Sequence, residues 1–142
     1  MEKLESVIFY SIEKAIKTYR QFAQRSISKA GLDITIDQWL VLRLIEEDGE
    51  RYQNEIAEAV FKDTASITRI VELLVLKGYL ERNAHPGDRR RFKLNVTEKG
   101  RELLARVSPI VKNYRDTALQ GISPSEIEAL QQVLNRIIAN CG

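Results

Sequence analysis

Two short amphipathic segments separated by only three residues constrain the fold of this chain more than any other feature. Apolar residues at helical spacing predict a short helix over about 54–60 and a longer one that begins after Asp63 and ends at Lys77-Gly78. Phe61-Lys62-Asp63 joins the two segments, with Asp63 as the expected N-cap. Two helices joined by a three-residue turn form a helix-turn-helix.

A basic β-hairpin is predicted directly after this motif. The segments 79–82 and 91–96 are predicted strands, the second because polar and apolar residues alternate in it. Between them, Pro86-Gly87-Asp88 favours a turn, and three consecutive arginines follow, namely Arg89, Arg90 and Arg91. A helix-turn-helix followed by such a hairpin is the arrangement of a winged helix.

Amphipathic helices are predicted on both sides of this lobe, which makes the fold class mainly α with a small β-wing. The first helix spans about 25 residues and ends near Gly31. Thr35 and Gln38 form a capping box for the next helix, while Thr97 and Ser123 cap the last two. The final helix is expected to bury an apolar stripe that consists of Ile127, Leu130, Leu134, Ile137 and Ile138.

Composition excludes several classes of protein. A chain of 142 residues with 44 % apolar residues has the size and make-up of one globular domain. With Cys141 and His85 as its single cysteine and histidine, the chain cannot form an internal disulfide, and we expect no metal or other cofactor. No glycine-rich phosphate loop or nucleophile–base pair is present, so we expect no enzyme. No apolar run is long enough for a membrane helix, and we expect a cytoplasmic protein.

Positive charge is concentrated in the middle of the chain. From Val60 to Arg101 there are ten basic and five acidic residues, whereas the rest carries twelve basic and fifteen acidic ones. A basic segment between acidic ends is typical of a module that binds a polyanion, because neutralised phosphates release condensed counterions. The alternative is a charged face that is merely solvated.

The first turns of the longer helix carry short hydrogen-bonding side chains, as a helix that reads the major groove requires. Hydroxyl groups and the Arg69 guanidinium could bind base edges or phosphates. The alternative is that Thr64 and Ser66 only occupy a helix start, where such residues are common. The residues that we expect to contact DNA are Gln53, Asn54, Thr64, Ala65, Ser66, Thr68, Arg69, Arg89, Arg90 and Arg91.

The wing arginines have a different expected role, because a hairpin tip fits the narrow minor groove or the phosphates beside it. Strand alternation predicts Arg89 and Arg91 on one face and Arg90 on the other. One arginine could therefore turn inward and pair with Asp88, which we expect to be structural. The alternative is a salt-bridged, solvated loop.

Six short segments occur in an order and spacing typical of one family. They are Val41-Leu42, Asn54-Glu55-Ile56-Ala57, Thr68-Arg69-Ile70-Val71, 77–82, 85–90 and 96–100. In these segments the chain resembles the MarR family of bacterial transcription regulators, closely over residues 35–105. The most diagnostic parts are the Asp-x-Arg of Asp88 and Arg90 and the Thr-x-x-Gly of Thr97 and Gly100.

The resemblance implies a homodimer whose two winged-helix lobes bind double-stranded DNA at a pseudo-palindromic operator. It implies one MarR-type chain over 1–142, a DNA-binding lobe at 35–100, and dimerisation helices at 1–30 and 98–140. Members of the family commonly bind a small aromatic or phenolic effector between these parts, which releases a repressor from DNA. Candidates to line such a site are Tyr19, Phe22, Trp39 and Tyr114, although large apolar residues of this kind are more often core.

The chain departs from the family pattern at two places. Tyr52 replaces a capping Thr or Ser and leaves Gln53 and Asn54 as substitutes for a phosphate contact. Leu73, Val75 and Leu76 replace charged residues, and Leu73 and Leu76 continue the face of Ser66 and Arg69. DNA reading would then be confined to the first two turns. An exposed apolar patch also supports an alternative function, a winged-helix module that binds a protein and not DNA.

Overall fold

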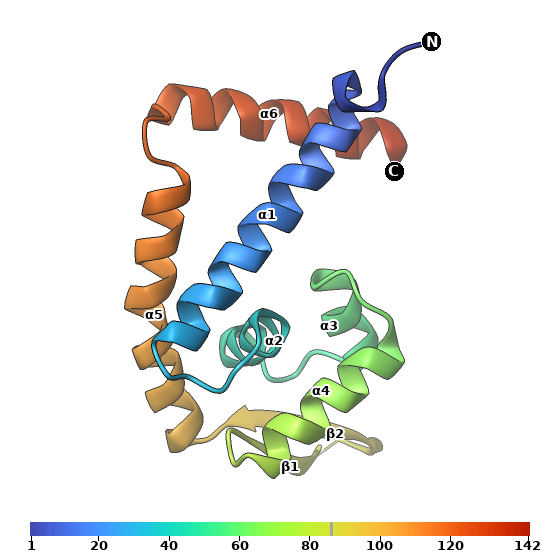
Figure 1. Ribbon diagram of the computed structural model, residues 1–142. Coiled ribbons are helices and arrows are strands. Elements are labelled where there is room, and N and C mark those ends of the chain that lie inside the picture. The colour runs from blue at the N-terminus through green and yellow to red at the C-terminus, as the bar shows by residue number, and fades with distance from the viewer. Residues whose placement is uncertain (86) are drawn as a thin grey trace.

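The computed structural model describes residues 1–85 and 87–142, without the side chains of His85 and of residues 88–92. A 3-10 helix, η1 (Leu4–Ser6), is followed by α1 (Ile8–Lys29), α2 (Ile36–Glu47), α3 (Gln53–Ala59), α4 (Thr64–Leu76), β1 (Leu80–His85), β2 (Asp88–Val96), α5 (Glu98–Ala118) and α6 (Pro124–Cys141). Figure 1 shows α2, α3, α4 and the hairpin gathered at one end, α6 at the other, and α1 and α5 running between them. The predicted fold class is confirmed.

Helix starts follow the capping chemistry that the sequence predicts. The Thr35 hydroxyl accepts from the Gln38 N–H at 3.1 Å, and the Gln38 side chain accepts from the Thr35 N–H at 3.1 Å. Ser123 and Glu126 form the same reciprocal pair at 3.2 and 3.0 Å. These bonds satisfy N–H groups that have no partner within the helix, so the predicted starts of α2 and α6 are confirmed.

The predicted third helix, residues 54–60, is displaced by one residue. It begins at Gln53 and ends at Ala59. The Glu55 carboxylate accepts from the Tyr52 N–H at 2.9 Å and so completes the first turn one residue earlier than expected.

The hairpin is longer than predicted. The first strand begins at Leu80, one residue later than predicted, and extends to His85, while the second begins at Asp88, because antiparallel pairing continues through Asn83↔Lys93 and Ala84↔Phe92. The next pair is His85↔Asp88, so residues 89–91 fall in a register shift of β2. The backbone of the three arginines therefore belongs to a bulged strand and not to a long loop.

α2 lies at the centre of one continuous core. It contacts α1, α4, α5 and β2, and it buries Trp39, Val41, Leu42 and Ile45. Burial of side chains of this size stabilises the fold by about 2 kcal/mol each.

Two cations from different elements meet at Asp37, near the start of α2. Arg20 of α1 donates to one carboxylate oxygen, and Nζ of Lys62, in the turn between α3 and α4, lies 3.1 Å from the other. All three side chains are partly exposed, so the ion pairs add little to the free energy of unfolding. They do hold α1 and the turn between α3 and α4 in position against α2. Asp37 thereby joins α1 and the helix-turn-helix to the same helix.

The Thr-x-x-Gly motif clamps α5 to the base of the wing. The Thr97 hydroxyl accepts from the Gly100 N–H at 3.0 Å and donates to the Gly78 carbonyl at 2.6 Å. A Cβ on Gly100 would overlap the Tyr79 carbonyl oxygen and would lie 2.7 Å from Val96 Cγ1. Only glycine allows this close approach.

The final helix does not bury its apolar stripe within one chain. No residue of α6 is buried, and Leu130 and Ile138 are 58 % and 67 % exposed. The expectation that Ile127, Leu130, Leu134, Ile137 and Ile138 are buried is therefore wrong for the single chain, because α6 extends away from the core (Figure 1). The N-terminal end of α1 is similarly uncovered, with Ile8 61 % exposed.

Phe61 occupies a strained position in the turn between α3 and α4. Its φ of 62° lies in the left-handed region, and its side chain is 95 % exposed. This conformation disfavours residues with a Cβ by roughly 1–2 kcal/mol. Because the Phe61 ring is exposed, no burial within the chain offsets this conformational cost.

We expect Gly100→Ala to lower the free energy of unfolding by about 2 kcal/mol, because the added methyl group forces the Tyr79 carbonyl or Val96 to move. Urea denaturation measures the change. Glu102→Ala, at an exposed position in the same helix, is the control and should stay within about 0.5 kcal/mol of wild type. An unchanged urea midpoint for Gly100→Ala would contradict the clamp.

Candidate functional site

The N-terminus of α4 is held by a chain of polar contacts. The Asp63 carboxylate accepts from the Ser66 N–H at 2.7 Å and from the Ser66 hydroxyl at 3.0 Å. These hydrogen bonds to the ionised form hold the pKa of Asp63 below its usual value. The Ser66 hydroxyl in turn accepts from the Arg69 guanidinium at 3.3 Å. The predicted cap is confirmed, and Ser66 serves to position Arg69.

Thr68 connects the two helices of the helix-turn-helix. Its Oγ1 lies 2.9 Å from Gln53 Oε1 and 3.0 Å from the Thr64 carbonyl oxygen, so its one proton is shared between two acceptors. Both Thr68 and Gln53 are half-buried. The structure brings these two predicted contact residues together in a bond that links α3 to α4.

Four of the predicted DNA contacts are left open to solvent in this region: Asn54, Thr64, Ala65 and Arg69. They lie at the first turns of α3 and α4, where backbone N–H groups also point outward. Arg69 is the one cation in α4, and its contact with Ser66 leaves its remaining donors available.

The second half of α4 is apolar on its outer face. Leu73 is 43 % and Leu76 82 % exposed, whereas Val75 packs against the core. The prediction that Leu73 and Leu76 continue the exposed face is confirmed, and Val75 is not part of that face.

The wing side chains lie outside the described residues. Asp88, Arg89, Arg90 and Arg91 belong to β2 by their backbone, and the expected alternation of the arginines and the structural role of Asp88 stay predictions. Nearby, Lys99 Nζ donates to the Lys77 carbonyl at 2.8 Å, which adds a cation at the wing base.

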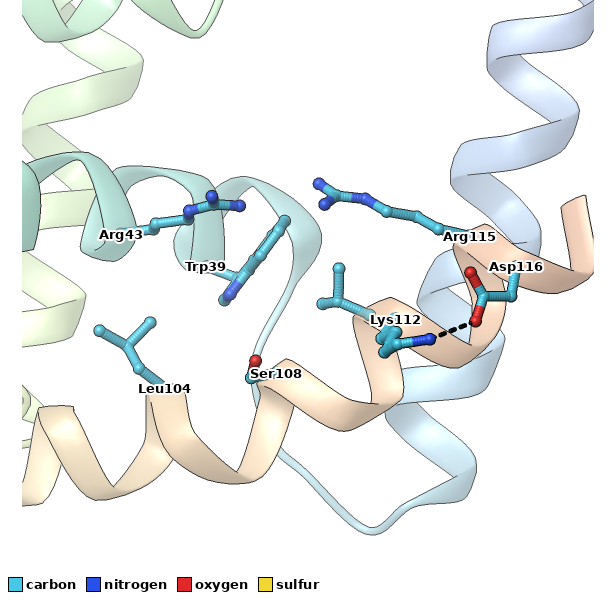
Figure 2. A pocket seen from close by; sticks show the side chains of 8 residues that line it. Trp39, Arg43, Leu104, Ser108, Lys112, Arg115 and Asp116 are labelled. Atoms are coloured by element: carbon cyan, nitrogen blue, oxygen red, sulfur yellow. Dashed lines mark hydrogen bonds and ion pairs between the residues drawn. The ribbon is translucent and has the colours of Figure 1, made fainter. Parts of the chain in front are cut away.

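A cleft between α2 and α5 forms a second candidate site. Its volume is about 400 Å³. The residues that line it are Trp39, Arg43, Leu104, Ser108, Val111, Lys112, Arg115 and Asp116. Figure 2 shows the guanidinium groups of Arg43 and Arg115 on either side of the upper edge of the Trp39 indole.

Positive charge dominates this cleft. The guanidinium carbons of Arg43 and Arg115 lie 5.6 and 5.8 Å from the Trp39 ring centre. Lys112 donates to Asp116 at 2.7 Å, and this contact raises the pKa of Lys112. Arg115 makes no ion pair with any described residue, so the cleft presents an aromatic face beside an uncompensated cation.

Of the four predicted effector contacts, the structure places Trp39 in the cleft. Tyr114 is 3 % exposed and packs edge-on against Tyr19, with ring centres 5.7 Å apart. Phe22 also packs against the core. Tyr19, Phe22 and Tyr114 are thus core residues that support the cleft but do not line it.

Comparison with known proteins supports the resemblance. A family model described as MarR family matches residues 31–91, which contain the helix-turn-helix and most of the hairpin. The resemblance to the MarR family is confirmed over these residues. The transcriptional regulator MhqR of Bacillus subtilis is 29 % identical over 133 residues, which cover 94 % of this chain and 90 % of that protein.

Two solved structures are similar to this chain throughout. CouR of Rhodococcus jostii RHA1, described as a transcriptional repressor bound to a 23-mer DNA duplex, has a TM-score of 0.85 and 25 % identity, and the match covers 97 % of this chain and 96 % of CouR. BpsR of Bordetella bronchiseptica, whose DNA binding is regulated by 6-hydroxynicotinic acid, has a TM-score of 0.86 at 20 % identity and 96 % coverage of both chains. The second likeness concerns the fold alone.

Sequence reasoning missed most of the residues that line the cleft. Arg43 and the α5 residues were not predicted, although Trp39 and Arg43 are four residues apart, as are Leu104, Ser108 and Lys112. That spacing places each set on one helix face. This four-residue spacing is visible in the sequence, but it identifies a cleft only once α2 and α5 are known to be neighbours.

Within the described part of the chain, no helix has the length and apolar character needed to span a bilayer. The same residues contain no group of three or more His, Cys, Asp or Glu side chains that could hold a metal ion.

We expect Tyr114 to ionise about two pH units later than an ordinary tyrosine. Burial raises its pKa from 10.0 to about 12, since the phenolate would be desolvated. Because the folded state favours the neutral phenol, this stabilisation is complete below about pH 10 and is lost as the pH rises toward 12. Tyrosinate absorbance followed against pH should show a late phase that Tyr114→Phe removes.

Tyr52→Phe, at an exposed tyrosine, is the control for this titration and should leave the late phase in place. Circular dichroism recorded on the same samples shows whether ionisation coincides with unfolding. A Tyr114→Phe difference curve centred near pH 10 would contradict the buried phenol.

Proposed function

We propose that the protein is a sequence-specific DNA-binding transcriptional regulator. The observation that carries the proposal is the outward-facing start of α4, where the Asp63 cap and the Gln53–Thr68 bond hold Thr64, Ala65 and Arg69 open to solvent. A basic hairpin follows α4, so one lobe offers a helix for the major groove and a wing for the backbone or minor groove. The DNA complex of CouR supports this use of the shared fold.

The acting form that we propose is a homodimer on a pseudo-palindromic operator. α6 buries no residue, and Leu4, Ile8 and Phe9 at the start of the chain are 67 %, 61 % and 58 % exposed. Figure 1 shows that these surfaces lie at the same end of the molecule, far from the wing. An apolar surface of this extent is covered most simply by a second copy, and two-fold symmetry matches two operator half-sites.

The regulatory site that we propose is the cleft between α2 and α5. Its indole face suits an aromatic ring, and Arg115 suits an anionic substituent such as a carboxylate or phenolate. α2 also contacts α4, which we propose as the recognition helix that enters the major groove. A ligand in the cleft therefore acts on the helix that supports the recognition helix. We propose a repressor that such a ligand releases, in keeping with the ligand dependence described for BpsR.

The second candidate function is a winged-helix module that binds a protein. Leu76, 82 % exposed at the end of α4, is the observation that favours it. Salt separates the two functions, because phosphate contacts weaken steeply as salt rises, whereas an apolar interface is nearly insensitive.

We expect selected duplex DNA to bind tightly at about 50 mM salt and far more weakly at about 200 mM, because Lys and Arg contacts to phosphates release counterions. Arg69→Ala should lose about 1–3 kcal/mol of discrimination between selected and random duplexes. Fluorescence anisotropy measures both quantities. Arg106→Ala removes an exposed arginine of α5 and is the charge-matched control.

An unchanged ratio of specific to non-specific affinity in Arg69→Ala would remove Arg69 from the base-reading residues. Absence of DNA binding by a folded dimer, verified by sedimentation, would favour the protein-binding module instead.

We expect 4-hydroxybenzoate to weaken operator binding more than the neutral 4-hydroxybenzamide of the same shape, because Arg115 recognises the carboxylate. Arg115→Gln should reduce the affinity for the acid by about 1.5–3 kcal/mol and leave that for the amide nearly unchanged. Isothermal titration with each compound tests this, with Arg106→Gln as control. Equal binding of acid and amide would exclude an anion-selective cleft.

A further inference from the structure

The outward face of α4 is mostly apolar, which is unusual for a helix that faces a polyanion. Ala65, Arg69, Leu73 and Leu76 recur at intervals of three or four residues and therefore share one side of the helix, and all are exposed. The opposite side carries Ile67, Val71 and Leu74, which are fully buried. Beyond Arg69 this face therefore offers carbon atoms and no cation.

The second half of this face has no basic residue that would bind phosphate. Glu72 is exposed beside Leu73, and its carboxylate repels the DNA backbone. The groups that an exposed leucine can contact in a major groove are the C5-methyl groups of thymine, which are the apolar feature of its floor. Leu73 lies one helical turn, about 6 Å, beyond Arg69, a distance of about two base-pair steps.

We propose that Leu73 determines operator specificity by packing against a thymine methyl group in each half-site. The proposal rests on the proposed DNA-binding function and gives the recognition helix two modes of reading. Arg69 supplies hydrogen bonds at the start of the face, and Leu73 supplies an apolar contact one turn later. Burial of the leucine on DNA offsets its exposure in the free protein.

The test replaces thymine by deoxyuridine, which removes the methyl group and leaves base pairing intact. An operator is first obtained by selection from random duplexes, and each thymine is then replaced singly. We expect one position per half-site at which the replacement lowers affinity about fourfold, and about fifteenfold when both half-sites are changed.

Leu73→Ala is the matching protein variant, and its exposed position leaves the core intact. It should bind the thymine operator about fourfold more weakly per half-site and should no longer distinguish it from the deoxyuridine operator at that position. Leu73→Met keeps an apolar side chain and should retain the distinction. Deoxyuridine placed outside the half-sites is the DNA control.

Two results would overturn the proposal while leaving DNA binding intact: no thymine whose methyl group affects affinity, or a Leu73→Ala variant that remains as sensitive to deoxyuridine as wild type. The second result is also what a leucine pair used for docking a protein would give. If selection yields no preferred sequence for a folded dimer, the proposed function fails, and this inference fails with it.

Discussion

Burial of α2 between four neighbours is the constraint on which the rest of the structure depends. Its apolar side chains are shared by α1, α4, α5 and β2, so none of these four elements can shift without repacking it. Asp37 near its first turn adds ion pairs to α1 and to the turn before α4. The same helix presents Trp39 and Arg43 to the cleft. The position of α4 and the shape of the cleft therefore both depend on how α2 is packed.

Local chemistry explains why much of the fold could be predicted from the sequence. Capping bonds at Thr35, Asp63, Thr97 and Ser123 join residues three positions apart, and such contacts are visible in a linear chain. The extent of the hairpin was underestimated, because polar residues such as Asn83 and Lys93 pair across strands without an apolar pattern. The burial of α6 was misjudged for a different reason. Periodicity identifies an apolar face but not the surface that covers it.

The candidate site was less predictable, because its decisive contacts join distant parts of the chain. Thr68 and Gln53 were both predicted to touch DNA, but their bond to each other spans two helices and depends on the angle between them. Arg115 becomes a candidate ligand contact only because α5 passes close to the Trp39 indole. Residue type alone suggested that Tyr114 was either core or ligand-binding, and the structure shows its ring buried against Tyr19.

The clamp at the start of α5 has a mechanical consequence. With Thr97 and Gly100 fixed to the wing base, the 21-residue helix is an arm of about 31 Å whose fulcrum lies beside the wing. The cleft lines the middle of that arm, from Leu104 to Asp116. A tilt of about 5° at the fulcrum displaces the far end by about 3 Å, close to the rise of one base pair. In the mechanism that we propose, leverage of this kind converts a small repacking around the Trp39 indole into a change of register on the DNA duplex.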